Sequence, residues 1–281
     1  MTKHENNARQ THITYDNMLN IITTGDIMTK SLSLADAIKN HLAKSTNDRN
    51  VEQAITTLSS MLFNLLNCQP LSNHTLFKDG YMVNFKDEKK YSATELETIN
   101  QMVSSYLQTV KSKKPFEDVL SDALASHLSG SWGQYLTPTD LAKSLSEFQI
   151  ISYLNSIKES HSKKQPYRIG DICGCGAGSL LMATLGTIYN HSPELLSCIS
   201  VTGVDLDETM CKLTASQLAF NCIIHNIDIF NIEVHHCHAI TEYGVKDNTS
   251  IFVFDRKIEK PINNLFKFLD AIHERYYKKA A

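Results

Sequence analysis

The sequence predicts an α/β protein, with a helical N-terminal domain (residues 1–129) followed by a domain built on a parallel sheet (residues 130–281). Apolar residues recur at helical spacing through most of the first half of the chain. After residue 166, short β-prone runs alternate with helical runs, which is the order expected of a parallel sheet. A glycine-rich turn follows the first of these β-prone runs, and such a turn is typical of folds that bind nucleotides.

The composition is that of a folded protein without a strong electrostatic field. Apolar residues make up 42% of the 281 residues, and the net charge is -3 with a pI near 6.4. No global positive field therefore indicates a nucleic-acid partner, although a local basic patch can serve that purpose. The N-terminus lacks an apolar signal core, no apolar run reaches membrane-spanning length, and the seven cysteines are scattered. We expect a cytoplasmic protein with reduced thiols.

Three long helices are expected in the N-terminal domain, beginning near Leu34, Val51 and Ser92. Each carries apolar residues at every third or fourth position, the pattern of an amphipathic helix. Ser92 and Glu95 also form a capping box, in which each side chain satisfies a backbone N–H at the start of the third helix. Up to about residue 129, the chain reads as helical.

Shorter elements are expected around these helices. Asp79 and Gly80 lie between two β-prone runs, so a small hairpin is an option there. Pro115 suits the first turn of a further helix. Thr139 can cap another helix, whose apolar residues share one face. These apolar residues are Leu141, Leu145, Phe148 and Ile151.

Residues 167–207 read in order as strand, glycine turn, helix, strand and acid. A β-prone run ends at Asp171 and leads into three glycines, and a second run ends at Asp205. The glycines are Gly174, Gly176 and Gly178. They allow a tight turn and close approach of a ligand, and the start of the helix offers unpaired N–H groups. A carboxylate at a strand tip can accept both hydroxyl hydrogens of a ribose, so this stretch predicts a nucleoside-containing ligand.

The alternation of elements continues after Asp205. Residues 208–226 predict a helix, residues 231–240 and 250–254 predict strands, and Pro261 begins a last helix. Cysteines and histidines are frequent in this region, but no pair shows the tight ligand spacing of a structural zinc site. We therefore expect no metal site, and no Ser-His-Asp or paired-carboxylate pattern marks a catalytic residue.

Three sequence motifs in a fixed order resemble a known family. They are GQYLTP at 133–138, Asp171 with CGAGSLL at 175–181, and GVDLD at 203–207. This order resembles adenine-N6 DNA methyltransferases, above all the methylation subunits of type I restriction–modification systems and their short phage- and plasmid-borne relatives. The resemblance covers roughly residues 114–240. It implies a helical N-terminal domain and a Rossmann-like domain that binds S-adenosylmethionine, with DNA as the methylated partner.

The resemblance also implies roles for the matching residues. A first group would close over the methionine end of the cofactor: Gln134, Tyr135, Thr137 and Pro138. A second group would form the turn beneath it: Asp171, Gly174, Gly176 and Gly178. Asp205 would hold the ribose hydroxyls. His238 stands in the region expected to contact adenine, where the family often has Asp or Asn.

The chain also departs from the family pattern. Three residues separate Asp171 from Cys175, where family members usually have two, so the turn is expected to be remodelled. The catalytic tetrapeptide Asn/Asp-Pro-Pro-Tyr/Phe, which holds the target amine and stacks on a flipped base, occurs nowhere in the sequence. The strand that should deliver it ends at Asp255, and 26 residues follow. We therefore expect a minimal or truncated methyltransferase domain that is not catalytic as a lone chain.

Two other functions are compatible with these departures. One is a non-catalytic accessory, regulatory or decoy protein that interacts with DNA or with restriction–modification machinery. The other is methylation of a different acceptor through non-standard residues.

With the four strands expected after residue 166 numbered in chain order, the predicted strand order is 3-2-1-4. In this order, missing strands leave an open edge beside the fourth strand. Because an open edge invites aggregation, we expect a partner chain, a homodimer contact or the final helix to cover it.

Overall fold

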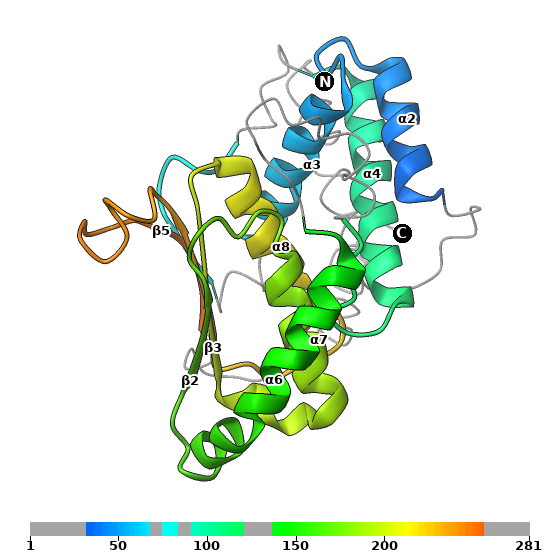
Figure 1. Ribbon diagram of the computed structural model, residues 1–281. Helices are drawn as coiled ribbons and strands as arrows, with labels where there is room; N and C mark the ends of the chain where they lie inside the picture. The colour runs from blue at the N-terminus through cyan, green and yellow to red at the C-terminus, as the bar shows by residue number, and fades with distance from the viewer. Residues whose placement is uncertain (1–31, 68–74, 84–90, 121–136, 256–281) are drawn as a thin grey trace, which may run out of the picture. The chain divides into compact units, whose positions relative to one another are not determined.

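The computed structural model describes residues 32–67, 75–83, 91–120 and 137–255 (Figure 1). The chain forms two compact units. Among the described residues, the first unit comprises residues 32–58 and 91–112, and the second comprises residues 59–67, 75–83, 113–120 and 137–255. The domain boundary between residues 129 and 130 stays a prediction. No helix in the described part of the chain is long and apolar enough to span a membrane.

The first unit contains three helical segments at the predicted places. They are α2 (Leu34–Lys44), the first half of α3 (Val51–Leu66) and α4 (Ala93–Ser112). Ser33 caps α2 by accepting the N–H of Asp36. Most of the apolar positions that predicted these helices are buried, among them Leu34, Ile38, Ile55, Leu58, Ile99, Val103 and Tyr106, whereas Leu42, Val51 and Leu96 are partly exposed. The helical reading of these segments is therefore confirmed.

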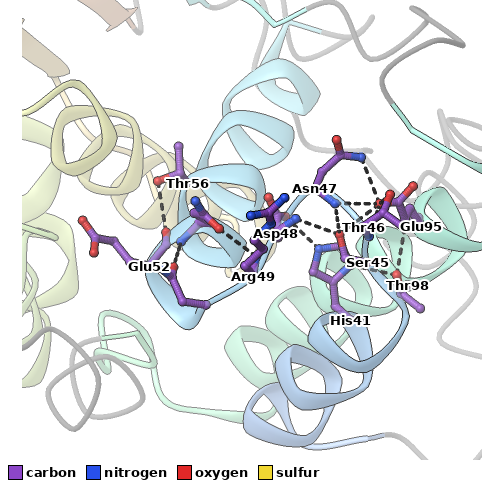
Figure 2. A network of polar contacts seen from close by, with 12 residues as sticks. His41, Ser45, Thr46, Asn47, Asp48, Arg49, Glu52, Thr56, Glu95 and Thr98 are labelled. Carbon is purple, nitrogen blue, oxygen red and sulfur yellow. Dashed lines mark hydrogen bonds and ion pairs between the residues drawn. The ribbon is translucent and has the colours of Figure 1, made fainter.

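The capping box at the start of α4 forms, and its Glu95 also binds the segment that follows α2, as Figure 2 shows. The Glu95 side chain is 1% exposed, and its Oε2 accepts the N–H and the hydroxyl of Ser92, both at 2.8 Å. Its Oε1 lies 2.8–3.2 Å from donor atoms of Ser45, Thr46 and Asn47. Beside it, the buried His41 places Nε2 2.8 Å from Asp48 Oδ2. One carboxylate thus ties the start of α4 to the loop after α2.

The second unit is built on a five-stranded sheet in the order β1-β5-β4-β3-β2. The strands are β1 (Thr75–Phe77), β2 (Tyr167–Asp171), β3 (Ile199–Asp205), β4 (Asn231–His236) and β5 (Ser250–Asp255). β2, β3 and β4 are parallel, whereas β5 is antiparallel to β4 and β1 is antiparallel to β5. The connecting elements are α6 (Thr139–Ser162), α7 (Ser179–His191), the 3-10 helix η2 (Pro193–Cys198) and α8 (Glu208–Ile224). The mixed α/β fold expected for this part of the chain is confirmed.

Helices α6, α7 and α8 lie on one side of the sheet (Figure 1). The strands alternate accordingly: Ile199 and Val201 are buried, and Ser200 and Thr202 between them are partly exposed. The same alternation holds in β4, where Glu233 is partly exposed between two buried apolar residues. This period of two is the pattern of a sheet with one face against a core and the other toward solvent.

The predicted strand order is wrong for the fourth strand. The order 3-2-1-4 would place β5 beside β2, but β5 lies beside β4 and runs antiparallel to it. The physical reason is the connection 237–249, which contains turns and no helix and so returns the chain beside β4. A parallel fourth strand needs a longer crossover, usually through a helix.

The open edge is consequently not beside β5. β1 covers that edge through an antiparallel pairing that matches Thr75 with Phe254. The rings of Phe63, Phe77 and Phe252 meet around this pairing, with centroids 5.2–5.9 Å apart. β2 forms the opposite edge of the sheet. Within the described ranges, it pairs with β3 on one side and with no strand on the other.

Two shorter predictions are also corrected. β1 pairs with β5 instead of forming a hairpin across Asp79 and Gly80, and residues 81–83 are not in a strand. No helix begins at Pro115, because Phe116 adopts a positive φ of 60° and donates its N–H to Asn221 Oδ1 at 2.7 Å. The helix expected from residue 261 lies outside the described residues.

The apolar face predicted for α6 is the exposed face of that helix. Leu141, Leu145, Phe148 and Ile151 are between 49% and 80% exposed. The residues that α6 buries are instead Ala142, Ser146, Ile150 and Ile157. Small residues on this side allow close packing against α7, where Ser146 Oγ lies 3.1 Å from Thr184 Oγ1. The prediction was right about which residues share a face, but it assigned the wrong face to the core.

Candidate functional site

The candidate site lies at the carboxyl ends of the three parallel strands. β2 ends at Asp171, β3 at Asp205 and β4 at His236, and the pairing register places Asp205 directly opposite His236. Parallel strands bring their carboxyl ends to one edge of a sheet, and ligands of α/β folds bind in the crevice outside that edge. The topology therefore gathers the two acids that the sequence analysis singled out.

The glycine turn between β2 and α7 uses the freedom of its glycines. Gly174, Gly176 and Gly178 have φ values of 118°, 55° and 93°, in a region that other residues rarely adopt. A Cβ on Gly178 would lie 3.2 Å from Thr214 Oγ1 on α8, so this glycine also permits close helix packing. A side chain at these positions would strain the turn.

The additional residue in the turn is accommodated at its outer side. Ile172 and Cys173 are exposed, and the N–H of Cys173 donates to the Asp171 carboxylate. The chain returns at Cys175, whose N–H donates to the carbonyl of Val204 at 2.9 Å. The turn therefore has an exposed outer segment between Asp171 and Cys175, and its remodelling relative to the family stays a prediction.

Asp205 is held by three backbone N–H groups, those of Gly176, Asp207 and Leu206. Its Oδ2 accepts the N–H of Gly176 and its Oδ1 accepts the N–H of Asp207, both at 2.8 Å. Burial raises the pKa of Asp205, the N–H groups of Asp207, Gly176 and Leu206 oppose that shift, and the nearby Asp207 charge adds to it. An ionised carboxylate has about four acceptor positions. The three backbone N–H groups therefore leave only part of this acceptor capacity to hydroxyl hydrogens of a ligand.

Asp171 is the second acid at this edge. Burial raises its pKa, the N–H of Cys173 opposes the shift, and the charge of Asp205 adds to it. A carboxylate whose ionisation is opposed by a neighbouring carboxylate favours a ligand with a positive group between or beside the two. The site is therefore suited to a cation that also carries hydrogen-bond donors.

A pocket opens beside Asp171 at the start of α7. It is lined by Thr137, Asp171, Gly174, Cys175, Gly176, Ser179 and Leu180. The N-cap of α7 is Gly178, and no side chain caps this helix start. A helix start attracts a carboxylate, and Asp171 attracts an ammonium group. The pocket thus suits the amino-acid end of a ligand. Asp205 is adjacent to the pocket, because it accepts the N–H of Gly176, one of the residues that line it.

The structure gathers most, but not all, of the predicted site residues. Thr137, Asp171, Gly174 and Gly176 line the pocket, Gly178 caps α7 and Asp205 bonds to the turn. Pro138 immediately precedes α6. Gln134 and Tyr135 lie outside the described residues.

His238 does not line the pocket. It is exposed, and its Nδ1 lies 3.3 Å from the N–H groups of Ile240 and Thr241, while its own N–H donates to Glu242 at 2.9 Å. These contacts assign His238 to the turn that follows β4.

Two residues of α8 support the glycine turn, a third holds Phe116, and none of the three was assigned a role from the sequence. Thr214 Oγ1 donates to the carbonyl of Gly176, and Gln217 Nε2 donates to the carbonyl of Ala177, both at 2.7 Å. Asn221 accepts the N–H of Phe116 at 2.7 Å. All three side chains are buried. Their spacing of three and four places polar side chains on one face of an otherwise apolar helix, and this pattern could have identified them.

We expect replacement of Gln217 by Leu to loosen the glycine turn. The change removes the donor to the Ala177 carbonyl and leaves that carbonyl without its side-chain partner, so the free energy of unfolding should fall by about 1–3 kcal/mol. Urea denaturation of the full chain measures this change. Gln149→Leu on the exposed side of α6 is the matched control, and an equal loss in both variants would contradict the support that Gln217 gives.

The histidines and cysteines near this edge pair with other groups. His235 Nδ1 lies 2.9 Å from Thr249 Oγ1, and Cys211 Sγ lies 3.3 Å from the carbonyl of His235. Among the described residues, no group of three or more His, Cys, Asp or Glu side chains is arranged to hold a metal ion.

Asp255, at the tip of β5, lies at the other end of the sheet. Because β5 is antiparallel to β4, its last residue pairs with Asn231, the first residue of β4. The strand expected to deliver a catalytic motif therefore leads away from Asp171 and Asp205. Asp255 is not part of the candidate site.

One comparison with known proteins gives a match. The family model described as N-6 DNA Methylase matches residues 114–262, which is more than half of the chain. No curated protein and no solved structure matches the sequence. The matched range contains α6 to β5 and all the residues that line the pocket.

Proposed function

Since the chain belongs to the N-6 DNA methylase family, we propose that it binds S-adenosylmethionine at the glycine turn and serves DNA adenine methylation without catalysing it as a lone chain. The observation that carries the proposal is the convergence of Asp171, Asp205 and the turn at one edge of the sheet. S-adenosylmethionine joins an amino acid, a sulfonium and an adenosine, and thus presents the groups that this edge suits.

Each end of the cofactor has a partner in this proposal. Asp171 faces the ammonium group, the start of α7 receives the carboxylate, and Thr137 closes the pocket. Asp205 accepts the ribose hydroxyls with the acceptor capacity that its three backbone bonds leave. The cofactor supplies a methyl group on a positively charged sulfur. The contribution of the chain is then to hold that methyl in place, which is a matter of positioning.

The proposal that the lone chain is not catalytic rests on two further observations. The sequence lacks the tetrapeptide Asn/Asp-Pro-Pro-Tyr/Phe, and β5 carries its tip to the end of the sheet opposite Asp205. A target amine would therefore find no orienting side chain from β5. A second chain of a restriction–modification system could supply one. The alternative is an accessory, regulatory or decoy protein that engages DNA or such a system without using the cofactor.

Two measurements on the full chain test this function. The first is calorimetric titration with S-adenosylmethionine, for which we expect micromolar binding, about -8 kcal/mol. The second is incubation with methyl-labelled cofactor and duplex DNA, RNA or protein, for which we expect no incorporation by the chain alone. Incorporation would overturn the non-catalytic part of the proposal. Absence of binding up to millimolar cofactor would overturn the cofactor part and leave the accessory function.

Cofactor binding should weaken in acid. The carboxylate form of Asp205 accepts the ribose hydroxyls, and its pKa lies above the ordinary value because of burial and the Asp207 charge. As the pH falls toward that raised pKa, protonation removes an acceptor, so the affinity at pH 5 should be lower than at pH 7.5. Titrations at both pH values measure the change. The same decline in an Asp205→Asn variant would show that another group causes it.

We also propose that a second chain covers the free side of β2. Within the described residues, β2 pairs with β3 alone, and α6 presents four exposed apolar side chains in the same unit. Free strand edges and apolar patches are hazards that proteins normally cover. Light scattering should report an oligomer, and a Phe148→Ser variant should shift it toward monomer, whereas Ser152→Ala should not. A monodisperse wild-type monomer would contradict the homo-oligomer.

A further inference from the structure

A chain of hydrogen bonds reaches the carboxyl edge of the sheet from residue 81. Tyr81 Oη lies 2.8 Å from His236 Nδ1, and His236 Nε2 lies 3.0 Å from the carbonyl oxygen of Leu206. Leu206 directly follows Asp205. The chain therefore ends beside the acid that the proposed function assigns to the ribose.

The groups bound at the two ends of this series of hydrogen bonds determine where its protons lie. The Leu206 carbonyl can only accept, so His236 Nε2 carries a proton and donates it. Nδ1 of the neutral ring is then an acceptor, and the Tyr81 hydroxyl donates to it. Burial raises the pKa of Tyr81, and the neighbouring Glu208 adds to the shift, so the hydroxyl keeps its proton. The tyrosine fixes the histidine in the tautomer that the Leu206 carbonyl requires.

The peptide group between Leu206 and Asp207 connects this series of hydrogen bonds to the Asp205 carboxylate. Its carbonyl oxygen accepts from His236, and its N–H donates to Asp205 Oδ1 at 2.8 Å. Both bonds belong to one planar unit, so holding the oxygen also aims the N–H. The orientation of the Asp205 carboxylate is thus coupled to His236 and, through it, to Tyr81.

The sheet topology explains why Tyr81 can reach this edge. β1 and β4 are both antiparallel to β5, so β1 ends at the same edge as β4. Tyr81 follows β1 by four residues, and its ring meets the His236 ring edge to face with centroids 5.6 Å apart. The residue lies outside the range 114–262 that the family model matches. The remote segment 75–83 therefore contributes a residue that the family pattern does not include.

We propose that Tyr81 and His236 are positioning residues that orient the Asp205 carboxylate toward the hydroxyl pair of a nucleoside ligand. The inference rests on the proposed function for the identity of the ligand, but the positioning itself is a property of the free protein. A merely structural pair would change stability alone. Removal of a positioning pair would also change the titration of Asp205 and the amount by which the ribose hydroxyls raise the affinity for a ligand.

The first test uses the free, full-length protein. Carbon NMR follows the titration of the Asp205 carboxyl, whose resonance an Asp205→Asn variant identifies. In Tyr81→Phe and His236→Leu the peptide N–H is no longer aimed at Oδ1, so the titration should move to higher pH. His236→Gln, whose amide can still donate to Leu206, should move less, and Tyr153→Phe on α6 should not move at all. Unchanged titrations in Tyr81→Phe and His236→Leu would overturn the inference.

The second test measures ligand discrimination. Adenosine and 2′,3′-dideoxyadenosine compete with S-adenosylhomocysteine for the wild-type chain, and the ratio of their affinities reports the contribution of the hydroxyl pair. Tyr81→Phe should reduce this ratio about tenfold, the equivalent of one hydrogen bond to a charged group. An equal loss for both competitors, with the ratio unchanged, would indicate a structural role only. If S-adenosylhomocysteine does not bind the wild type, the proposed function fails, and the carboxyl titration still decides the positioning.

Discussion

Glu95→Gln should destabilise the protein by about 3 kcal/mol. The carboxylate is 1% exposed, and donors from Ser92 converge on one oxygen while donors from residues 45–47 converge on the other. An amide keeps one acceptor but turns the other into a donor that faces existing N–H or O–H groups. At least one buried donor then loses its partner, and the start of α4 loses half of its capping box.

The effect should also depend on pH in a defined direction. Burial alone would raise the pKa of Glu95, but the hydrogen bonds from Ser92, Thr46 and Ser45 outweigh it and hold the pKa far below its usual range. A depressed folded-state pKa gives stability that is present above the unfolded pKa, about 4.3, and is lost as the pH falls below it. The wild type should therefore lose stability in acid more steeply than Glu95→Gln.

Urea denaturation of the full chain at pH 7 and at pH 3.5 measures both parts of this prediction. Glu97→Gln is the matched control, because Glu97 is exposed on the same helix and its change should stay within about 0.5 kcal/mol. Equal stability of Glu95→Gln and wild type at pH 7 would contradict the role of the network in Figure 2.

The features that the sequence predicted correctly depend on residues close together in the chain. Ser92 and Glu95 are three positions apart, and the capping box needs nothing beyond that spacing. The glycine turn and the acid at the end of β3 are likewise fixed by a local order of strand, turn, helix and strand. Local patterns also located α2, α3 and α4, since their apolar positions follow the helical period.

Features set by distant pairing could not be predicted in the same way. The β-prone run 250–254 is compatible with a place beside β2 or beside β4, and its partner is decided by the connection 237–249 and by β1. The exposed face of α6 illustrates a second limit. Periodicity identifies residues that share a face, but small residues such as Ala142 and Ser146 can form the packed side when the neighbouring helix approaches closely.

The site shows the same division. Asp171, Asp205 and the glycines follow from local motifs, whereas Gln217 and Tyr81 act across the fold. Gln217 could have been suspected, because a fully buried amide on an apolar helix needs a partner. Tyr81 carries no comparable signal, since its place at the site depends on the pairing of β1 with β5.

Asp205→Asn should strongly weaken cofactor binding while leaving the fold intact. Replacing the carboxylate removes the acceptor for at least one ribose hydroxyl and the charge that strengthens both bonds, so the affinity for S-adenosylmethionine should fall about 100-fold. The amide also cannot accept from both Gly176 and Asp207, which costs the free protein roughly one hydrogen bond, about 1 kcal/mol.

That loss should be offset by the removal of a buried charge. The folded-state pKa of Asp205 is raised, so the ionised group is less stable in the folded than in the unfolded chain. The contribution of Asp205 to the stability of the fold is fully present below the unfolded-state pKa and is lost as the pH rises through the folded-state pKa. At pH 7 the charge of Asp205 therefore opposes folding. The net change in unfolding free energy for Asp205→Asn should therefore stay within about 1 kcal/mol.

Calorimetry and urea denaturation of the same preparations separate the two effects. Asp255→Asn is the matched control, because this residue pairs with Asn231 at the opposite end of the sheet, and it should leave the affinity unchanged. Loss of binding without loss of stability would mean that the protein maintains an unfavourable buried charge for the sake of a ligand. Unchanged binding in Asp205→Asn would remove Asp205 from the site, and an unfolded variant would mean that the acid supports the turn and not the ligand.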